Sequence, residues 1–440
     1  MSHSHERDIS VEALARVEGE GAMRVRIRDD HVEHVALEIY EPPRFFEALL
    51  VGREYTEPPD LTARICGICP VAYQLSAINA IEDACGVEPP PMIRLLRRLL
   101  YCGEWIESHV LHVFLLHAPD FLGYQSAIDM AADHHALVEQ GLRLRKLGNT
   151  LLEVIGGRAI HPINVRVGGF HRAPRAATLQ ALRPELEWVR DAAIATVRVV
   201  AGFDFPDLQQ HHVYVALRPD VGWGPDAAPG YPLETGRVVA SDGLDIAVQQ
   251  WPRWFREEHV PHSTALHGRM VTGATYAVGP QARFALNADR LHAPAADVAA
   301  EVGLVAPERN PFRSILVRAV ETVEAIDEAL RLIDAYEEPE RAAVTVPAVE
   351  GVGHGATEAP RGILYHRYAI SAEGLVAAAT IVPPTAQNQP AMEADLAGFV
   401  QRHLDLDDEA LRWRSEQAIR NYDPCISCST HFLDLQVDRD

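Results

Sequence analysis

The chain has 440 residues, of which 48% are hydrophobic and 23% are charged, a composition typical of a globular protein with a large buried core. Its formal net charge of −22 argues against nucleic acid or an anionic membrane surface as a partner. No apolar run approaches the roughly 18–20 residues of a membrane span, and the first residues lack the basic and apolar regions of a secretory signal. We therefore expect a cytoplasmic protein with no membrane span.

The spacing of apolar residues predicts a mainly α fold of the α+β class. Alternation on both sides of Asp29-Asp30 predicts a hairpin within the first forty residues, and a second hairpin is expected at 363–382. The segment 205–300 is expected to be irregular, with some strand. Helical spacing predicts helices over 45–51, 70–85, 92–117, 133–155, 185–202, 314–336 and 408–420.

No linker, repeat or low-complexity tract separates these elements. We therefore expect one domain over residues 1–440, with a large helical-bundle core. Small antiparallel sheets are expected near the N-terminus and around 363–382.

Four of the six cysteines form two Cys-x-x-Cys motifs at opposite ends of the chain, Cys66/Cys69 and Cys425/Cys428. Pro70 suits the first position of a helix, so the first pair is expected at a helix N-terminus, where the partial positive charge favours thiolate over thiol. Thiolates bind zinc, copper(I), iron or nickel. Spacing alone favours a closed structural zinc site. However, structural zinc usually organises a small local module, and a core of this size needs no such support.

The residues around the two pairs carry a more specific signal. The segments Arg64–Pro70 (RICGICP) and Asp423–His431 (DPCISCSTH) resemble the two signature motifs of the large subunit of nickel–iron hydrogenases. Further matches follow in the expected order and cover essentially the whole chain: Arg16–Gly19 (RVEG), Arg44–Glu47 (RFFE), Gly156–Pro162 (GGRAIHP), Glu358–Gly362 (EAPRG) and Val382–Thr385 (VPPT).

The details are most similar to the cytoplasmic, bidirectional, pyridine-nucleotide-linked branch, which includes the sulfhydrogenases. CPVAYQ, PRFFEA and PPTAQNQ are the segments that carry this closer likeness. Two positions depart from the uptake hydrogenases. Tyr73 stands where those enzymes typically carry His, and Ser108 where they carry Asp.

The resemblance implies a nickel ion held by Cys66, Cys69, Cys425 and Cys428. Cys69 and Cys428 would bridge to an iron that carries CO and cyanide, whereas Cys66 and Cys425 would bind nickel alone. Such a centre leaves an open position between the two metals for H₂.

The resemblance also implies catalytic roles. H₂ cleavage releases a proton, which would pass from the Cys425 thiolate to Glu18. Arg361 would hold its guanidinium over the open coordination position. Pro384 and Thr385 would line the pocket of the diatomic ligands, with the Thr385 hydroxyl donating to a cyanide.

A second ion, Mg²⁺ or Fe²⁺, is implied near this centre. Glu47 and His431 match its side-chain ligands, and the backbone carbonyl of Thr380 would be a third ligand. A maturation protease commonly removes the extension after this histidine in the family, so we expect a cut after His431.

The implied function is the catalytic large subunit of a hydrogenase, which interconverts H₂ with two protons and two electrons. Because the motif cysteines are all used at this centre, an iron–sulfur small subunit is expected as an obligate partner. Flavin- and NAD(P)-binding diaphorase subunits are expected beyond it. A regulatory H₂-sensing hydrogenase and a non-catalytic zinc–thiolate scaffold stay as alternatives, whereas the related respiratory complex I subunit lacks the four cysteines.

Other residues that could bind metal have simpler explanations. His109, His112 and His117 lie on one predicted helix, where core or interface histidines are expected rather than a second metal site. Cys85 and Cys102 have no partner motif and are expected to be buried thiols.

Overall fold

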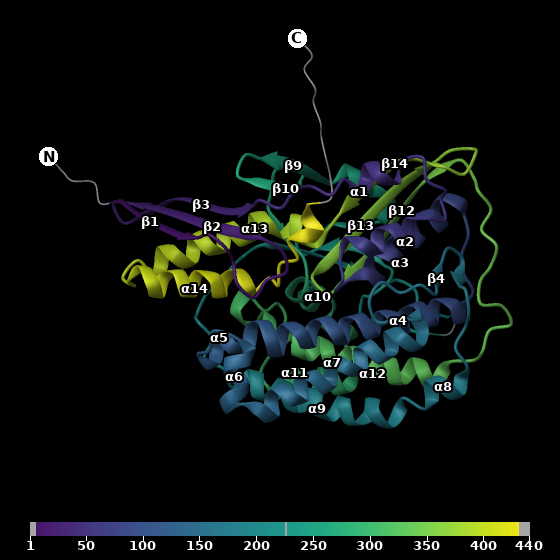
Figure 1. The fold of residues 1–440 in the computed structure, drawn as a ribbon, viewed down its shortest axis with the longest axis horizontal. Coiled ribbons are helices and arrows are strands. Elements are labelled where there is room, and N and C mark those ends of the chain that lie inside the picture. The colour runs from purple at the N-terminus through teal and green to yellow at the C-terminus, as the bar shows by residue number, and fades with distance from the viewer. Residues whose placement is uncertain (1–5, 225–226, 431–440) are drawn as a thin grey trace, which may run out of the picture.

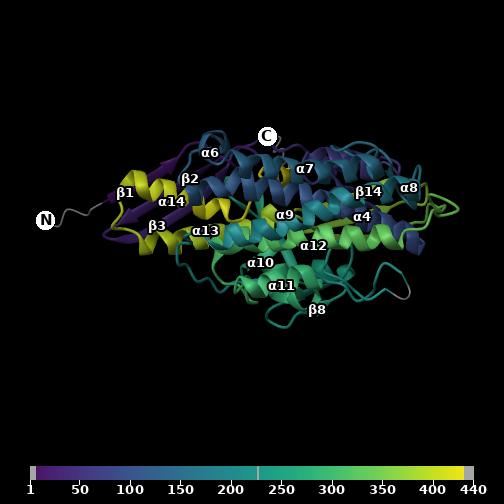
Figure 2. The same cartoon turned by 90° about the horizontal axis from the view of Figure 1, so that it is seen from below.

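The computed structural model describes residues 6–224 and 227–430. Its lower half in Figure 1 is a layer of long helices, and its upper half holds small sheets with shorter helices between them. The layer contains α4 (Pro91–Val110), α7 (His135–Gly156), α9 (Arg183–Ala201) and α12 (Ser314–Ala335). Seen from below, α10 (Pro280–Asn287) and α11 (Ala293–Glu301) lie on one side of this layer (Figure 2).

Close packing in the helical layer depends on small residues. A Cβ atom on Gly148 of α7 would lie 2.7 Å from the Glu107 amide of α4, and one on Gly103 would lie 3.1 Å from the Gly148 carbonyl. The two helices can therefore approach backbone to backbone. In α12, apolar side chains such as Val320 are fully buried, so this helix forms the centre of the main core.

The remaining helices are mostly short. They are α1 (Phe46–Leu50), α2 (Pro58–Thr62), α3 (Pro70–Cys85), α5 (Ala118–Leu122), α6 (Ala127–Asp133), α8 (Ala176–Gln180), α13 (Pro384–Arg402) and α14 (Asp408–Arg420). Of these, α5, α6 and α8 lie with the helical layer in Figure 1, and the others lie among the sheets. A π-helical segment, Leu111–His117, continues α4. Short 3₁₀ turns occur at Ala63–Ile65, Val248–Arg253, Ala288–Arg290, Pro311–Arg313 and Ser427–Ser429.

Two antiparallel three-stranded sheets carry the segments next to the cysteines. The first has the order β1 (Glu6–Val11), β2 (Gly21–Arg28), β3 (His31–Ile39), and the second the order β12 (Gly351–Ala359), β13 (Gly362–Ile370), β14 (Val376–Val382). In the first, Val25 lies opposite Ile9 and Val35. These apolar residues face the core, as the alternating sequence of β2 predicts.

Three smaller sheets complete the fold. One has the order β11 (Tyr276–Ala277), β6 (Val213–Arg218), β7 (Arg237–Ala240), β8 (Asp245–Ile246). The others are the pairs β9 (Phe255–Val260) with β10 (Ser263–Met270), and β4 (Val165–Arg166) with β5 (Gly169–Phe170).

Helix α3, which follows the first cysteine pair, lies directly on β12. A Cβ atom on Gly353 would lie 1.9 Å from the Ala80 carbonyl, and one on Gly355 would lie 2.3 Å from the Ser76 carbonyl. Glycine at both positions allows the helix backbone to lie against the strand. This contact fixes the start of α3 relative to the turn between β12 and β13.

The structure confirms the α+β class, both hairpins and each predicted helix. The helix expected over 92–117 changes from α to π geometry at Leu111. Strands β1 and β12 and helices α10, α11 and α13 are not among the predicted elements. Helix α13 contains Pro390 in its interior, a residue that argues against a helix in sequence. None of the helices in residues 6–224 and 227–430 is long and apolar enough to cross a bilayer.

Candidate metal centre

The four motif cysteines meet in the interior of the protein. Their Sγ atoms all lie within 4.8 Å of one another, and all four residues are buried. The distances are 3.5 Å from Cys66 to Cys425, 3.7 Å from Cys69 to Cys428 and 2.7 Å from Cys425 to Cys428. The two ends of the chain therefore build one tetrathiol cluster.

The first pair occupies the start of α3. Cys69 is the residue before the first helical position, and the amides of Ile68 and Cys69 both point at Cys66 Sγ, at 3.3 Å. Amide donors and the helix N-terminus both stabilise a negative sulfur. The predicted placement of this pair at a helix N-terminus is confirmed.

The second pair is held by the segment that contains Glu18. A parallel bridge joins Glu18 to Cys425: the Glu18 amide donates to the Pro424 carbonyl at 3.4 Å, and the Ile426 amide donates to the Glu18 carbonyl at 2.9 Å. This pairing brings Glu18 Oε2 to 2.9 Å from Cys425 Sγ. The same oxygen accepts the Ser427 amide at 3.2 Å.

Gly19 makes this close pairing possible. Its φ of +91° is unfavourable for other residues, and a Cβ atom there would lie 2.7 Å from Ile426 Cβ and 2.9 Å from the Ser427 amide. The glycine that follows Glu18 thus allows the two segments to pair.

Arg361 lies in the turn between β12 and β13 and is buried. Its Nε atom donates to the Asp423 carbonyl at 2.6 Å, and Nη2 donates to Asp423 Oδ1 at 3.0 Å. Its Nη1 atom is buried and has no hydrogen-bond partner among the described residues. Because Asp423 binds the guanidinium through Nε and Nη2, the Nη1 donor beside the thiols remains available to a bound group.

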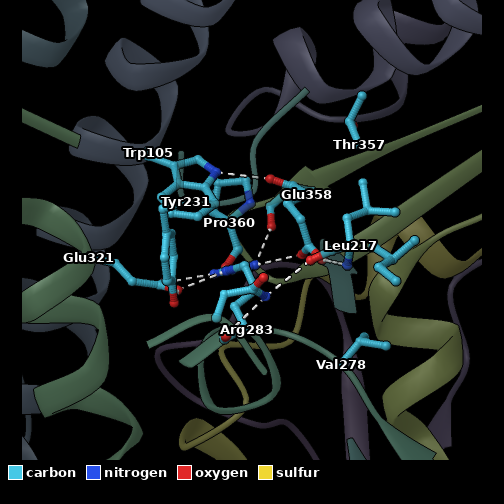
Figure 3. Close-up of polar contacts among 12 residues, drawn as sticks. Trp105, Leu217, Tyr231, Val278, Arg283, Glu321, Thr357, Glu358 and Pro360 are labelled. Atoms are coloured by element: carbon cyan, nitrogen blue, oxygen red, sulfur yellow. Dashed lines mark hydrogen bonds and ion pairs between the residues drawn. The ribbon is translucent and has the colours of Figure 1, made fainter. Parts of the chain in front are cut away.

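A buried ionic network supports the Arg361 turn (Figure 3). Arg283 of α10 is fully buried and donates to both oxygens of Glu321, to Glu358 and to the carbonyls of Ala359 and Pro360. The last two carbonyls belong to the residues directly before Arg361. Arg283 therefore fixes the backbone from which Arg361 projects.

The second half of this network comes from α4 and β6. Trp105 Nε1 donates to the Glu358 carbonyl at 2.9 Å, and the Leu217 amide donates to Glu358 Oε1 at 2.7 Å. Burial raises the pKa of Glu358 to about 7, although the Arg283 charge opposes this effect. Both oxygens of this carboxylate are thus bound to protein groups.

Pro384 and Thr385 begin helix α13, and both are buried. Thr385 Oγ1 accepts the Cys425 amide at 2.9 Å. Because a hydroxyl can donate while it accepts, its proton can point elsewhere. The structure places these two residues beside the second cysteine pair.

Glu47 lies on α1 and binds the edge of β14. Its Oε1 atom accepts the Ile381 amide at 2.6 Å, and burial raises its pKa to about 7. Thr380 is the adjacent strand residue, so the Glu47 carboxylate and the Thr380 backbone lie close together. His431 lies outside the described residues.

The four thiols are buried and close together, so each strongly affects the pKa of the others. The hydrogen bond from Cys425 is the largest of the effects that lower the pKa of Cys66, whereas burial raises the pKa of Cys425 and of Cys428. Tyr73 is also buried, and this burial, followed by the charge at Cys428, raises its pKa.

The donor set fits a nickel–iron centre. Soft thiolates bind such metals well, and all four sulfurs face one another with the Arg361 cation beside them. A second group of donors, at Glu47 and Thr380, lies at β14 and fits a hard cation such as Mg²⁺.

Sequence reasoning missed three residues that shape this centre. Asp423 binds Arg361, Arg283 supports the turn, and Arg44 joins the two cysteine loops by donating to the carbonyls of Ile65 and Ser427. Asp423 and Arg44 stand inside the quoted motifs, which was a usable signal. Arg283 lies in the segment expected to be irregular and had no such signal.

Cys102 is buried as expected, whereas Cys85 is only half-buried. His109, His112 and His117 are all buried in the core, as expected.

Comparison with known proteins agrees with this geometry. The family model described as nickel-dependent hydrogenase matches residues 44–141 and 273–431. The alpha chain of sulfhydrogenase 1 from Pyrococcus furiosus is 35% identical over 431 residues, which cover 97% of this chain and 98% of that protein. The alpha chain of sulfhydrogenase 2 from the same organism is 33% identical over 432 residues, which cover 97% of this chain and 100% of that protein.

A solved structure of an NAD⁺-reducing [NiFe]-hydrogenase in the H₂-reduced state superposes with a TM-score of 0.84 at 27% identity, over 97% of this chain and 99% of the other. The [NiFeSe] hydrogenase of Desulfovibrio vulgaris Hildenborough, at 20% identity and a TM-score of 0.78 over 97% of this chain and 100% of its own, shares the fold. Matched motifs, whole-length similarity and a shared fold lead to one conclusion: the chain belongs to the nickel-dependent hydrogenase family.

Proposed function

We propose that this chain is the catalytic large subunit of a nickel–iron hydrogenase, which interconverts H₂ with protons and electrons. One observation carries the proposal: four buried thiols converge at one point, and a carboxylate lies 2.9 Å from one of them. A closed zinc site requires no carboxylate against its sulfur ligands. A proton-transfer site does.

Cys66, Cys69, Cys425 and Cys428 would hold the nickel, with Cys69 and Cys428 shared with an iron that carries CO and cyanide. When bound, this centre supplies the heterolytic cleavage of H₂. The Thr385 hydroxyl, which accepts the Cys425 amide, would donate a hydrogen bond to a cyanide. Pro384 would supply apolar lining beside it.

Glu18 receives the proton from Cys425 Sγ. The short distance needs no rearrangement, and the Ser427 amide orients the receiving carboxylate. Asp423 holds Nε and Nη2 of Arg361, and Nη1, which has no partner among the described residues, would point toward the reaction site. The function of Arg361 is thus electrostatic, and the function of Asp423 is to position it.

Glu47, the Thr380 carbonyl and His431 would bind a Mg²⁺ or Fe²⁺ ion close to the C-terminal segment. The raised pKa of Glu47 supports this assignment, because a buried carboxylate without a cation is costly. Removal of the residues after His431 would follow metal insertion.

Electrons must leave through an iron–sulfur small subunit. Exposed apolar side chains beside the first cysteine loop support docking there: Ile160 is 56% exposed, and a Cβ on Gly67 would lie 4.0 Å from its Cγ2 atom. The likeness to an NAD⁺-reducing enzyme supports flavin- and NAD(P)-binding subunits beyond it, in the cytoplasm. The large subunit itself would fold as one domain.

Infrared spectroscopy of the complex, purified from a host that matures such enzymes, tests the proposal. We expect bands from metal-bound CO and cyanide, together with nickel and H₂-dependent dye reduction. Zinc in place of nickel, with no such bands, would instead support a scaffold. A complex that has the bands but turns over H₂ only very slowly would support a sensor.

A further inference from the structure

His262, His267 and Glu393 form a second group of metal-binding side chains, separate from the cysteines. One ligand atom of each lies within 4.8 Å of the other two. His262 lies in the turn between β9 and β10, His267 lies within β10, and Glu393 lies on α13. Because Glu393 is eight residues beyond Thr385 on the same helix, it lies about 12 Å along the helix axis from the residue that contacts the tetrathiol cluster.

The local fold brings the three side chains together. The β9–β10 pairing shifts register between Ser263 and His267, a bulge of the kind that re-aims side chains. A Cβ on Gly268 would lie 2.8 Å from Gln387 Cα, so β10 can lie against α13. The hairpin and α13 are adjacent in Figure 1.

His267 is 1% exposed, yet its Nε2 atom makes no hydrogen bond within the described residues. The Nε2 atom of Gln389, one turn before Glu393 on α13, is likewise buried and makes no hydrogen bond of good geometry among the described residues, and the Gln389 side chain lies beside His267. Buried nitrogens without partners are costly, and they are rare in folded proteins.

The carboxylate is already oriented for a ligand role. Glu393 Oε1 lies 2.7 Å from His262 Nε2 and accepts the Leu37 amide of β3 at 3.0 Å. Such outer hydrogen bonds fix the orientation of metal ligands. The nearby hairpin cation, Arg269, is engaged by Glu258.

We propose that His262, His267 and Glu393 bind a divalent transition-metal ion of the zinc class, which fastens the β9–β10 hairpin to α13. Two imidazoles and one carboxylate suit zinc, with water at the fourth position, whereas Mg²⁺ and Ca²⁺ prefer oxygen ligands alone. Tetrahedral zinc at its usual bond lengths separates its donors by about 3.3 Å. The three donors already lie within 4.8 Å of one another, close to that spacing.

Zinc content of the purified hydrogenase complex tests this site independently of catalysis. The wild type is compared with His267→Gln, Glu393→Gln and the control His259→Gln, an exposed histidine of the same hairpin. Each complex is equilibrated with micromolar zinc, desalted and analysed for zinc, nickel and iron. We expect one more zinc per large subunit in the wild type and control than in the other two, with nickel equal in all four.

Glu393→Gln keeps an oxygen acceptor for the Leu37 amide. It should therefore fold even if His267→Gln does not. Zinc should also raise the thermal midpoint of the wild type by several degrees and leave that of Glu393→Gln unchanged. Equal zinc in all four complexes, or no retained zinc in the wild type, would overturn the proposal. The cluster would then be a hydrogen-bonded contact between the hairpin and α13.

Discussion

Glu18 Oε2 lies 2.9 Å from Cys425 Sγ, although 407 positions separate the two residues in the chain. The contact is built into the backbone, because the amide of Ile426 and the carbonyl of Glu18 pair directly. The backbone of Glu18, the proposed proton acceptor, therefore cannot move away from Cys425 without breaking this bridge. This relationship determines the first two predictions.

Glu18→Gln should reduce H₂-dependent dye reduction by at least about 100-fold, the usual size of a general-base contribution. The amide oxygen can still accept the Ser427 amide, so the cysteine loop should stay in place. Nickel content and the infrared bands of the centre are the measurements that show whether it does.

Glu18→Asp is the matched control, because it keeps a carboxylate but moves it away by one methylene. It should retain intermediate activity. A Glu18→Gln enzyme with more than half of wild-type activity would remove Glu18 from the proton path.

Gly19→Ala should disrupt the same bridge, because its Cβ would lie 2.5 Å from Glu41 Oε1 and 2.7 Å from Ile426 Cβ. We expect lower nickel retention, measured by metal analysis, and loss of most activity. Gly52→Ala is the control. Gly52 also has positive φ, at +83°, but no atom lies within 4 Å of the added methyl group. The Gly52→Ala variant should lose only roughly 1–2 kcal/mol of stability, from backbone strain, and should keep its nickel.

The sequence was sufficient to predict the elements with regular periodicity and the residues inside dense motifs. The α3 helix is an example: Pro70 and Gly86 mark its ends, and its Cys69 lies where the thiolate argument requires it. Prediction failed where tertiary contacts override local preference. Helix α13 tolerates Pro390 because its first half is entirely buried against other elements.

The residues that support the metal centre could not be predicted from the sequence for a related reason. Arg283 and Glu358 meet only through the tertiary fold, 75 positions apart. The segment around Arg283 lacks a clear period of its own. Local sequence patterns indicate the secondary structure of a segment, but they say little about which residues are buried beside it.

Arg283→Lys should weaken the network shown in Figure 3. A lysine cannot bind Glu321 through two nitrogens while it also reaches the Ala359 and Pro360 carbonyls. Because both carboxylates in this network are fully buried, we expect a loss of about 3–5 kcal/mol in the free energy of unfolding, measured by urea titration. Activity should fall as well, because the Arg361 turn loses its support.

Arg218→Lys provides the comparison. Arg218 also binds a carboxylate, Asp289, through two nitrogens, but the Asp289 side chain is 61% exposed. Its replacement should cost no more than about 1 kcal/mol. Equal losses in the two variants would show that burial does not govern the strength of the Arg283 network.

Thr385→Val should leave the buried Cys425 amide without its acceptor, which lies at 2.9 Å. We expect a loss of about 1–3 kcal/mol in stability from the unpaired amide. If the hydroxyl also donates to a cyanide, the cyanide bands in the infrared spectrum should shift. Thr385→Ser keeps the hydroxyl and should change neither. Unshifted cyanide bands in Thr385→Val would mean that Thr385 only holds the cysteine loop and does not bind a cyanide.

His109 should make the chain sensitive to acid. It is fully buried, and burial lowers its pKa from 6.5 to about 4 even though Nε2 lies 3.0 Å from Glu321 Oε2. Between pH 6.5 and 4 the unfolded chain therefore binds a proton at His109 that the folded chain does not. Stability is fully present above pH 6.5 and falls as the pH decreases to 4, by about 3 kcal/mol for a shift of this size.

The partner carboxylate does not cancel this effect. Burial opposes ionisation of Glu321, but Arg283 lowers its pKa to about 2, so Glu321 stays charged through the whole window. His109→Gln removes the titrating group. The stability difference between the wild type and His109→Gln, from urea unfolding at each pH, should shrink by about 3 kcal/mol from pH 7 to pH 4. A constant difference for His109→Gln would mean that the buried imidazole is protonated in the folded protein.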